Sequence, residues 1–489
     1  MVCLAAAAVG LVLVASLNDM EGKWLIALPA VLLFWGAVFL SGRVERFLLG
    51  CLFLALPLNA DFQILPPVTA WQGVDLPKGV PQMGLSIIDL LLMVLYFLWI
   101  GQLLKARRRE ILWPAGASLA LGLILWGGVS MLNAQSMRLG FYLLFNYVKA
   151  FLLFFYVANR IKTREDFLLV ARCLALGMIL EGFIVFAQHL HGGNLGLDAL
   201  GERKVEKEVE MVSGTLFRPG GTLGHPNELG GYLASVLPIL LALVLTPVRR
   251  AKGSLLFMAA FGIGCVSLIL SLSRSAWLTG GLSCLGLLIW AAVRQKGKFD
   301  WRPVLGLSFL GLLATLLFAP LVIARWGEDD KGSTYSRIPQ SEMALEVVRQ
   351  HPFLGVGLNN FTVSSYLYET YVVDPKTRGR VYGVPGRVHD VFLQMAAEIG
   401  LIGLAWFALF MVWAVRKGRL RIHRCSEEQV RWILMGVFCG LLARLFHDAV
   451  HTGDVAMTHQ LWIYPGLLAA GAWVSRSAPG KLSARGGAG

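Results

Sequence analysis

Residues Val388 to Leu404 read V-H-D-V-F-L-Q-M-A-A-E-I-G-L-I-G-L, an apolar helical pattern that opens with a single histidine. This segment follows the longest polar stretch of a hydrophobic chain, so it predicts a membrane helix that begins at the aqueous boundary. An imidazole at that boundary titrates near neutral pH and can meet water on one side and a lipid-borne molecule on the other. We therefore take His389 as a candidate general base.

The composition predicts an integral membrane protein. The chain has 489 residues, of which 56% are hydrophobic and only 15% are charged, and this is more apolar surface than a soluble core would bury. The net charge of +14 comes from short Lys and Arg clusters between apolar runs, a pattern that argues against a nucleic-acid partner. Seven cysteines lie in apolar runs or in a basic loop and are expected to be small core residues.

The apolar runs predict an all-α fold, a polytopic membrane bundle of about 12 to 14 transmembrane helices with a long outer loop that carries short helices. Each run has roughly 17 to 25 residues, the length needed to cross a bilayer. The runs lie at 2–18, 24–41, 45–60, 86–104, 112–132, 139–159, 166–190, 227–247, 253–273, 275–293, 303–324, 390–415, 430–450 and 458–475.

Basic clusters occur at every second loop, which predicts that these loops and both termini are cytoplasmic. The opposite loops face outward, to the periplasm in a Gram-negative cell, and are 61–85, 191–226, 272–275, 325–389 and 451–457. The expected organisation is N-terminal helices at 1–190, a periplasmic loop at 191–226, central helices at 227–324, a long periplasmic loop at 325–389, C-terminal helices at 390–475 and a cytoplasmic tail at 476–489.

The outer loop at 325–389 is too long to be a plain connection, and loops of this length usually have a function. Its segment Ser341–Gln350 has apolar residues at helical spacing, which predicts a short helix along the membrane surface that stops at His351-Pro352.

Three arginines stand in the outer loops, against the usual inside bias of basic residues: Arg218, Arg274 and Arg337. The planar guanidinium suits two-pronged contact with phosphate oxygens, so each is a candidate anion ligand. The alternative for each is a snorkelling side chain or a salt bridge to a loop carboxylate.

The glycine-rich stretch after Arg218 could present N–H groups to an anion. Thr222 or Asn227 could cap the next helix, and capping is the expected role of Asn227. His225 precedes a proline and is expected to be a packed loop residue.

A second polar cluster lies at the outer end of the helix at 430–450 and holds Arg444, His447, Asp448, His451 and Asp454. The two histidines are spaced i, i+4 on one helical face, which permits a metal. A pair of ligands is weak evidence, and the favoured alternative is a hydrogen-bonded network that orients His389 or the substrate.

Two ionisable residues fall inside apolar runs, Lys149 and Glu181. A charge within a membrane is costly and marks a functional candidate, while a structural polar contact explains each residue equally well. For His389, the alternative to catalysis is a histidine hydrogen-bonded to backbone at the helix start. Arg387 and Asp390 beside it favour the functional interpretation.

Four segments together resemble the O-antigen ligase and polymerase superfamily of bacterial membrane glycosyltransferases. They occur in the order of that family and cover about residues 215 to 415. The segments are R-P-G-G-T-L-G-H-P-N-E-L-G-G-Y-L from Arg218, S-L-S-R-S-A-W-L from Ser271, R-I-P-Q-S-E-M-A-L-E-V-V-R-Q-H-P-F-L-G-V-G-L-N-N-F from Arg337, and H-D-V-F-L-Q-M-A-A-E-I-G-L-I-G-L from His389.

The resemblance implies an inverting enzyme of the inner membrane that needs no metal or other cofactor. Its donor would be an undecaprenyl-diphosphate-linked glycan, and its acceptor a lipid A-core or another glycan, with membrane lipids around it. By position, Arg218 and Arg274 look like the residues that bind the donor diphosphate, with Arg337 assisting, and His389 looks like the base that deprotonates the acceptor hydroxyl. The active site would face the periplasm.

One departure from the family is that its usual His-Asn pair is His-Asp here, so Asp390 could orient the imidazole or simply cap the helix. Within the family, an O-antigen ligase is the favoured interpretation, and a repeat-unit polymerase and a protein O-oligosaccharyltransferase share the same motifs. The alternative of another class is a transporter of lipid-linked oligosaccharides, with Lys149 and Glu181 lining its path.

Overall fold

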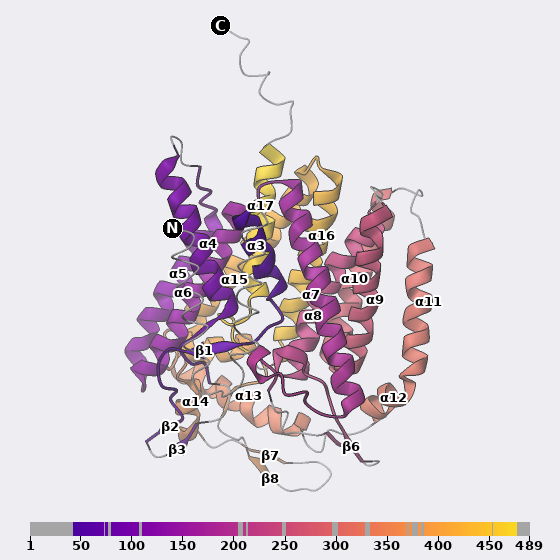
Figure 1. The fold of residues 1–489 in the computed structure, drawn as a ribbon. Helices are drawn as coiled ribbons and strands as arrows, with labels where there is room; N and C mark the ends of the chain where they lie inside the picture. The colour runs from indigo at the N-terminus through magenta and orange to yellow at the C-terminus, as the bar shows by residue number, and fades with distance from the viewer. Residues whose placement is uncertain are drawn as a thin grey trace, which may run out of the picture.

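Lipid offers no partners to backbone N–H and C=O groups, so membrane-crossing segments fold as helices that satisfy these groups internally. The computed structural model describes residues 43–72, 74–76, 80–106, 110–203, 209–211, 214–246, 251–295, 302–327, 333–368, 371–373, 380–382, 386–451 and 453–476. In these residues the chain forms a bundle of long helices with short strands at one end (Figure 1). The predicted all-α, polytopic membrane bundle is confirmed.

Most predicted apolar runs are helices in the structure. The long helices are α4 (Ile87–Lys105), α5 (Ala115–Ser130), α6 (Met137–Arg160), α7 (Arg164–His191), α8 (Pro226–Leu245), α9 (Ala251–Leu270), α10 (Arg274–Gln295), α11 (Arg302–Leu317), α15 (Val391–Arg424), α16 (Glu428–Asp448) and α17 (Gln460–Arg476). In the described part of the chain, 8 helices are long and apolar enough to cross a membrane: α4, α5 with the turn after it, α6, α7, α8, α10, α15 and α16. The runs predicted at 2–18 and 24–41 lie outside the described residues.

Two predicted spans differ from the structure for reasons of proline chemistry. The run at 45–60 forms α3 (Val44–Leu54), which has only 11 residues and ends shortly before Pro57. The run at 303–324 is divided at Phe318 into α11 and α12 (Ala319–Gly327), where Pro320 enters the first turn of the second helix. Proline favours a helix start and disfavours helix in the residue before it, so both breaks follow from local chemistry.

The helix that begins after His389 is not one straight span. At Gly400 the backbone turns to φ 70° and ψ 176°, a conformation that favours glycine, and a Cβ there would overlap the Phe353 carbonyl. The backbone at this break is hydrogen-bonded from outside: the Val356 N–H donates to Ala397 O at 3.0 Å and the Trp126 indole N–H donates to Ile399 O at 2.9 Å. Residues 391–399 therefore form a separate short arm at one end of the bundle.

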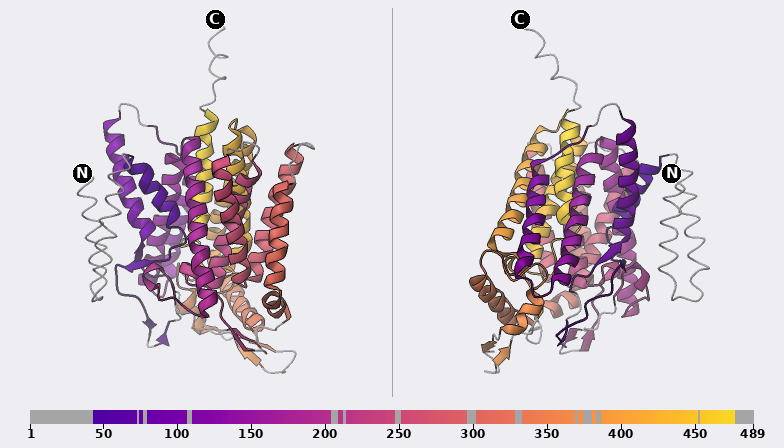
Figure 2. Two further views of the ribbon diagram at one scale, coloured as in Figure 1. Left: turned by 45° about the vertical axis from the view of Figure 1, so that its right-hand side comes forward. Right: turned by 90° about the vertical axis from the view of Figure 1, so that its left-hand side faces the viewer.

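Helix α8 is the centre of the bundle. It packs against α9, α10 and α16, and nearly all of its 20 residues are buried. A Cβ on Gly440 of α16 would overlap the Ser235 carbonyl of α8, so glycine allows these two backbones to approach closely. Helix α11 stands at the rim of the bundle (Figures 1 and 2).

Segments that the sequence assigned to one side of the membrane gather at one end of the bundle, here called the loop end (Figure 1). The short elements at this end are β1 (Asp61–Gln63), β2 (Ala70–Trp71), β3 (Val74–Asp75), β4 (Gly84–Ser86), β5 (Val209–Met211), β6 (Gly214–Leu216), α13 (Ser333–Gln350), α14 (Phe361–Ser364), β7 (Tyr371–Val373) and β8 (Arg380–Tyr382). The strands pair antiparallel as β1–β4, β2–β3, β5–β6 and β7–β8. The side of the membrane that this end faces stays a prediction.

The predicted surface helix exists and is longer than expected. It is α13, which begins at Ser333 rather than Ser341 and lies across the loop end (Figure 2). Its Met343, Ala344 and Val347 pack in one buried cluster with Val388 and with residues of the short arm of α15. The long loop is thereby fixed against the segment that carries His389.

Candidate functional site

The first turn of α8 joins two site segments. The Nδ1 atom of His225 accepts a hydrogen bond from the Asn227 N–H at 3.1 Å, and the His225 side chain is exposed rather than packed as predicted. A neutral ring can act as this acceptor. The prediction that Asn227 caps the helix is wrong, because His225 is the cap and the Asn227 side-chain oxygen instead accepts from Arg218 at 3.0 Å.

Three arginines gather at the tight turn between α9 and α10. Arg218 donates to Ser271 O from Nε at 3.2 Å and from Nη2 at 3.1 Å, and Arg325 of α12 donates to Leu272 O at 3.1 Å. Leu272 has φ 51°, and Arg274 opens α10 two residues later. Cations at the carbonyl end of a helix are favourable, and their clustering makes this turn strongly positive.

Arg325 was missed by the sequence analysis. It is 8% exposed and lies in α12, directly after the apolar run predicted at 303–324 and at the first position of the predicted outer loop. A basic residue at the outer end of an apolar run, against the inside bias, was the available signal.

Two adjacent glycines let other elements approach the start of α8. A Cβ on Gly230 would lie 2.7 Å from the Ala276 Cβ, and one on Gly231 would lie 2.7 Å from Arg444 Nη1 and from His447 Cδ2. Larger residues at these positions would push α10 and α16 away. The pair G-G in the sequence is therefore a packing requirement of the site.

Glu228 of α8 contacts a polar cluster formed by α16 and the loop that follows it. Arg444 contacts Glu228 at 3.2 Å and Asp448 at 2.8 Å, and His451 Nε2 lies 3.0 Å from Glu228 Oε1. The Arg444 and Asp448 side chains are 2% and 0% exposed, whereas the Glu228 side chain is 31% exposed, so the network meets solvent at Glu228. Glu228 was not among the predicted site residues, although it lies just inside an apolar run.

His447 and His451 take part in hydrogen bonds of this cluster. His447 Nε2 lies 3.0 Å from Asn227 O, and its Nδ1 lies 3.4 Å from the Ser275 hydroxyl. His447 therefore connects the start of α8 to the residue next to Arg274. In the described ranges no group of three or more His, Cys, Asp or Glu side chains is arranged to hold a metal ion.

The turn that carries His389 is fixed on both sides. Before it, Arg387 donates to Gly453 O and contacts Asp454 at 3.4 Å. After it, the Asp390 carboxylate accepts from the Phe392 and Leu393 N–H groups at 2.9 and 3.0 Å. Asp390 was expected either to orient the His389 imidazole or to cap the helix, and in the structure it caps the helix.

The loop after α16 brings the two halves of the site together. His451 Nε2 lies 3.0 Å from Glu228 Oε1, and two residues later Gly453 O accepts a hydrogen bond from Arg387. Contacts therefore run from Arg218 through the start of α8 to the turn that carries His389. Arg337 lies in α13, N-terminal to the residues that pack near Val388. The catalytic and binding roles of these residues stay predictions.

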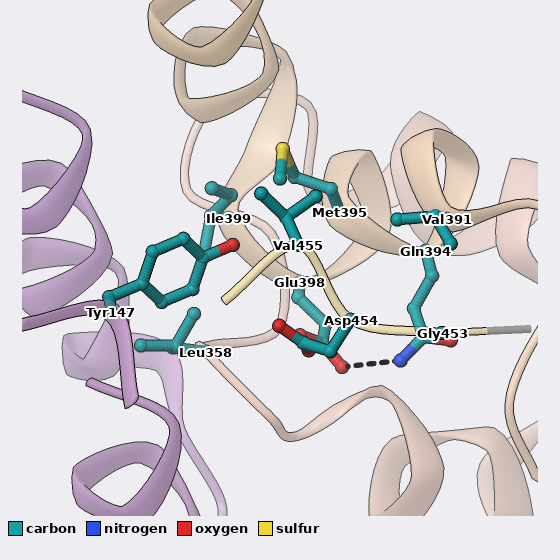
Figure 3. Close-up of a pocket in the computed structure, with 10 residues that line it drawn as sticks. All are labelled: Tyr147, Leu358, Val391, Gln394, Met395, Glu398, Ile399, Gly453, Asp454 and Val455. Carbon is teal, nitrogen blue, oxygen red and sulfur yellow. Dashed lines mark hydrogen bonds between the residues drawn. The ribbon is translucent and has the colours of Figure 1, made fainter. Parts of the chain in front are cut away.

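A small polar cavity lies behind this turn, between α6, the short arm of α15 and the loop after α16 (Figure 3). Its volume is about 10 Å³, the space of one water molecule. It is lined by Tyr147, Leu358, Val391, Gln394, Met395, Glu398, Ile399, Gly453, Asp454 and Val455.

Lys149 and Glu181 each have local partners at the loop end. Lys149 donates to Asp89 and to Gly84 O, both at 2.8 Å. The carboxylate of Glu181 accepts from the Thr222 N–H at 2.8 Å and from its hydroxyl at 2.7 Å. The structural interpretation offered for both residues matches these contacts.

Membrane-length helices that bring arginines, histidines and carboxylates together at one end define a polytopic membrane protein with a buried polar site at the loop end. Residues 259–408 match a sequence family described as O-antigen ligase, and this region includes Arg274, Arg337 and His389. Over this region the match supports the resemblance to the O-antigen ligase and polymerase superfamily. No curated protein matches the chain.

Proposed function

We propose that the protein transfers a glycan from an undecaprenyl-diphosphate carrier to an acceptor hydroxyl at the loop end. The family match supports an enzyme of the O-antigen ligase or polymerase type acting on a lipid-linked glycan. The observation that carries the proposal is the contact path from Arg218, through Asn227 and Glu228, to the turn with His389.

In this proposal Arg218 and Arg274 stabilise the diphosphate of the donor, and Arg337 assists. Negative charge grows on the diphosphate as the sugar C1–O bond breaks, and fixed cations in a partly dry site stabilise it. His389 accepts the proton of the attacking hydroxyl, and a single displacement inverts the anomeric carbon. This chemistry is proposed to proceed without a metal ion.

The acceptor we favour is a lipid A-core, which makes the enzyme an O-antigen ligase of the inner membrane with its loop end in the periplasm and both termini in the cytoplasm. The basic clusters at alternate loops support this orientation. Repeat-unit polymerisation and transfer to protein use the same donor chemistry and are the alternatives.

A transporter of lipid-linked glycans is the alternative of another class. It would need charged groups along a path through the bundle. Lys149 and Glu181 were the candidates for such a path, and their partners Gly84 and Thr222 belong to segments of the loop end. These contacts favour the enzyme.

The deciding experiment is a transfer assay with purified protein and an undecaprenyl-diphosphate oligosaccharide. Lipid A-core, donor alone and a candidate acceptor protein are supplied in separate reactions. A larger lipid A-core product supports the ligase, a ladder from donor alone supports a polymerase, and a glycosylated protein supports the third activity. Movement of donor across liposomes with no product in any reaction would support the transporter.

A further inference from the structure

The cavity behind the His389 turn contains two buried carboxyl groups. Glu398 and Asp454 are 4% and 8% exposed and both line the cavity. The charged group that contacts this pair in the described residues is Arg387, which lies 3.4 Å from Asp454. One guanidinium beside two carboxylates leaves one negative charge in a dry site, a costly arrangement unless a proton or a cation balances it.

The hydrogen bonds separate the roles of the two carboxyls. Asp454 accepts from the Ala456 N–H at 2.8 Å and from Arg387, which is the environment of an ionised carboxylate. Glu398 accepts from neutral groups, the Asn359 N–H at 3.0 Å and the Gln394 amide at 3.2 Å. Burial raises the pKa of Asp454, and Arg387 and the Ala456 N–H oppose this rise.

The hydroxyl of Tyr147 supplies a second, independent observation. Tyr147 is 4% exposed, and its hydroxyl makes no hydrogen bond to any residue within the part of the chain that the structure describes. Figure 3 shows this hydroxyl pointing toward the side of the cavity where Val455, Glu398 and Asp454 lie. A buried hydroxyl is normally hydrogen-bonded, and the cavity has the volume of one water molecule.

The cavity is linked to the candidate base through side chains. Arg387 Nε donates to Gln394 Oε1 at 3.4 Å, and the Gln394 amide donates to Glu398. Arg387 precedes His389 by two residues, so these contacts set where the His389 turn lies against the arm of α15.

We propose that the cavity binds one water molecule between the Tyr147 hydroxyl and the Glu398–Asp454 pair, that the pair holds one proton on Glu398, and that this network positions the His389 turn. Glu398 and Asp454 are thus positioning residues that act through Gln394 and Arg387. The positioning role rests on the proposed function of His389, whereas the water and the proton do not.

The bound proton is tested by thermal unfolding of the purified protein across pH. A raised carboxyl pKa means that the folded state holds the proton above the ordinary pKa of about 4, so stability is lost as pH rises through the folded pKa. Glu398→Gln resembles the protonated acid and cannot lose the proton. We expect its Tm to match the wild type near pH 4, where the carboxyl is protonated in both states, and to fall less steeply than that of the wild type as the pH rises from there. Identical pH dependence of the two proteins would overturn the assignment.

Two further measurements test the same site. In a water-filled cavity Tyr147→Phe removes a hydrogen bond and lowers Tm, while in a dry cavity it removes a buried unpaired hydroxyl and raises Tm. A rise would therefore refute the bound water. A Tm that depends on sodium, with choline as the control ion, would show that a cation rather than a proton balances the pair.

The positioning role is measured by transfer kinetics. Glu398→Ala should lower kcat about 10-fold or more with little change in the KM for donor, and Glu398→Gln should restore most of the loss. Asp454→Asn should not keep the transfer rate as Glu398→Gln does, because asparagine removes the carboxylate that contacts Arg387. Equal loss in the two Glu398 variants would refute the role. If no transfer is found at all, the unfolding measurements still decide the cavity, and only the proposed function fails.

Discussion

Two buried charge clusters of this protein differ in where their partners come from. Lys149 of α6 pairs with Asp89 of α4 at 2.8 Å, and Asp89 also accepts from the Ser86 N–H at 2.8 Å. That cluster closes on itself between α6 and the start of α4. Arg444 instead joins α16 to Glu228 of α8 and to Thr458 of the following loop.

The difference shows that a buried charge by itself does not mark a functional site. Lys149 and Arg444 are both expensive to bury and both paired. The Arg444 cluster reaches candidate site residues in two places: His447 contacts Ser275, which follows Arg274, and His451 lies two residues before Gly453, whose carbonyl accepts from Arg387. We therefore expect the Lys149 cluster to contribute stability alone and the Arg444 cluster to contribute to transfer as well.

The largest effect on transfer is expected at His389, the proposed base. His389→Ala should lower the transfer rate by about 10² to 10⁴-fold, the usual contribution of a general base. Donor binding and Tm should change little. The matched control is His191→Ala, an exposed histidine at the loop end, which should transfer normally. Wild-type turnover by the His389 variant would remove it as the base.

The comparison itself is tested by removing one cation from each cluster. Arg444→Met and Lys149→Met each leave carboxylates buried without their partner, a change that typically destabilises by about 3 to 5 kcal/mol. The loss is measured as the change in the free energy of unfolding of each purified variant. Transfer per folded molecule should fall for the Arg444 variant and persist for the Lys149 variant, and the reverse pattern would show that the two clusters have been misassigned.

A smaller effect is expected at the tight turn between α9 and α10, where Arg218, Arg274 and Arg325 gather. Arg274→Ala should weaken donor binding about 10 to 100-fold, since a hydrogen bond to a charged group contributes about 1.5 to 3 kcal/mol. Arg274→Lys should restore only part of the affinity, because an ammonium cannot make the two-pronged contact. Donor affinity measured by titration decides this. Arg349→Ala, whose side chain is 75% exposed, serves as the control.

The sequence predicted the helices and the grouping of the loops because both depend on hydrophobic runs and on the positions of basic residues. It did not predict the break at Gly400, since the apolar pattern continues through that residue and the cause lies in Phe353, far away in the chain. Local reasoning also assigned the cap of α8 to the wrong side chain. Asn227 has the usual capping chemistry, but Arg218 takes its oxygen.

The candidate site was predictable where a residue violates a local rule. Arg218 and Arg274 oppose the inside bias of basic residues, and His389 is a polar residue at the start of an apolar run. Glu398 violates the rule that drew attention to Lys149 and Glu181, because it is ionisable and lies inside the apolar run at 390–415, but it was overlooked. Asp454 was noticed only as a member of the cluster at the outer end of the helix at 430–450. Their significance comes from contacts across 56 positions of the chain, which only the fold brings together.

The smallest expected effect decides what Asp390 does. If its role is the observed cap, Asp390→Ala should lower the free energy of unfolding by about 1 kcal/mol, and Asp390→Asn should retain nearly all of it because asparagine caps equally well. If Asp390 instead makes His389 more basic, Asp390→Asn should remove a neighbouring negative charge, lower the pKa of the imidazole and shift the pH profile of transfer to lower pH. The electrostatic role therefore predicts a downward shift with unchanged Tm, and the capping role predicts no shift in either direction.

Parallel measurement of Tm and of the pH profile for both variants separates these outcomes, and a downward shift for Asp390→Asn would assign the acidic side chain to the base rather than to the helix alone.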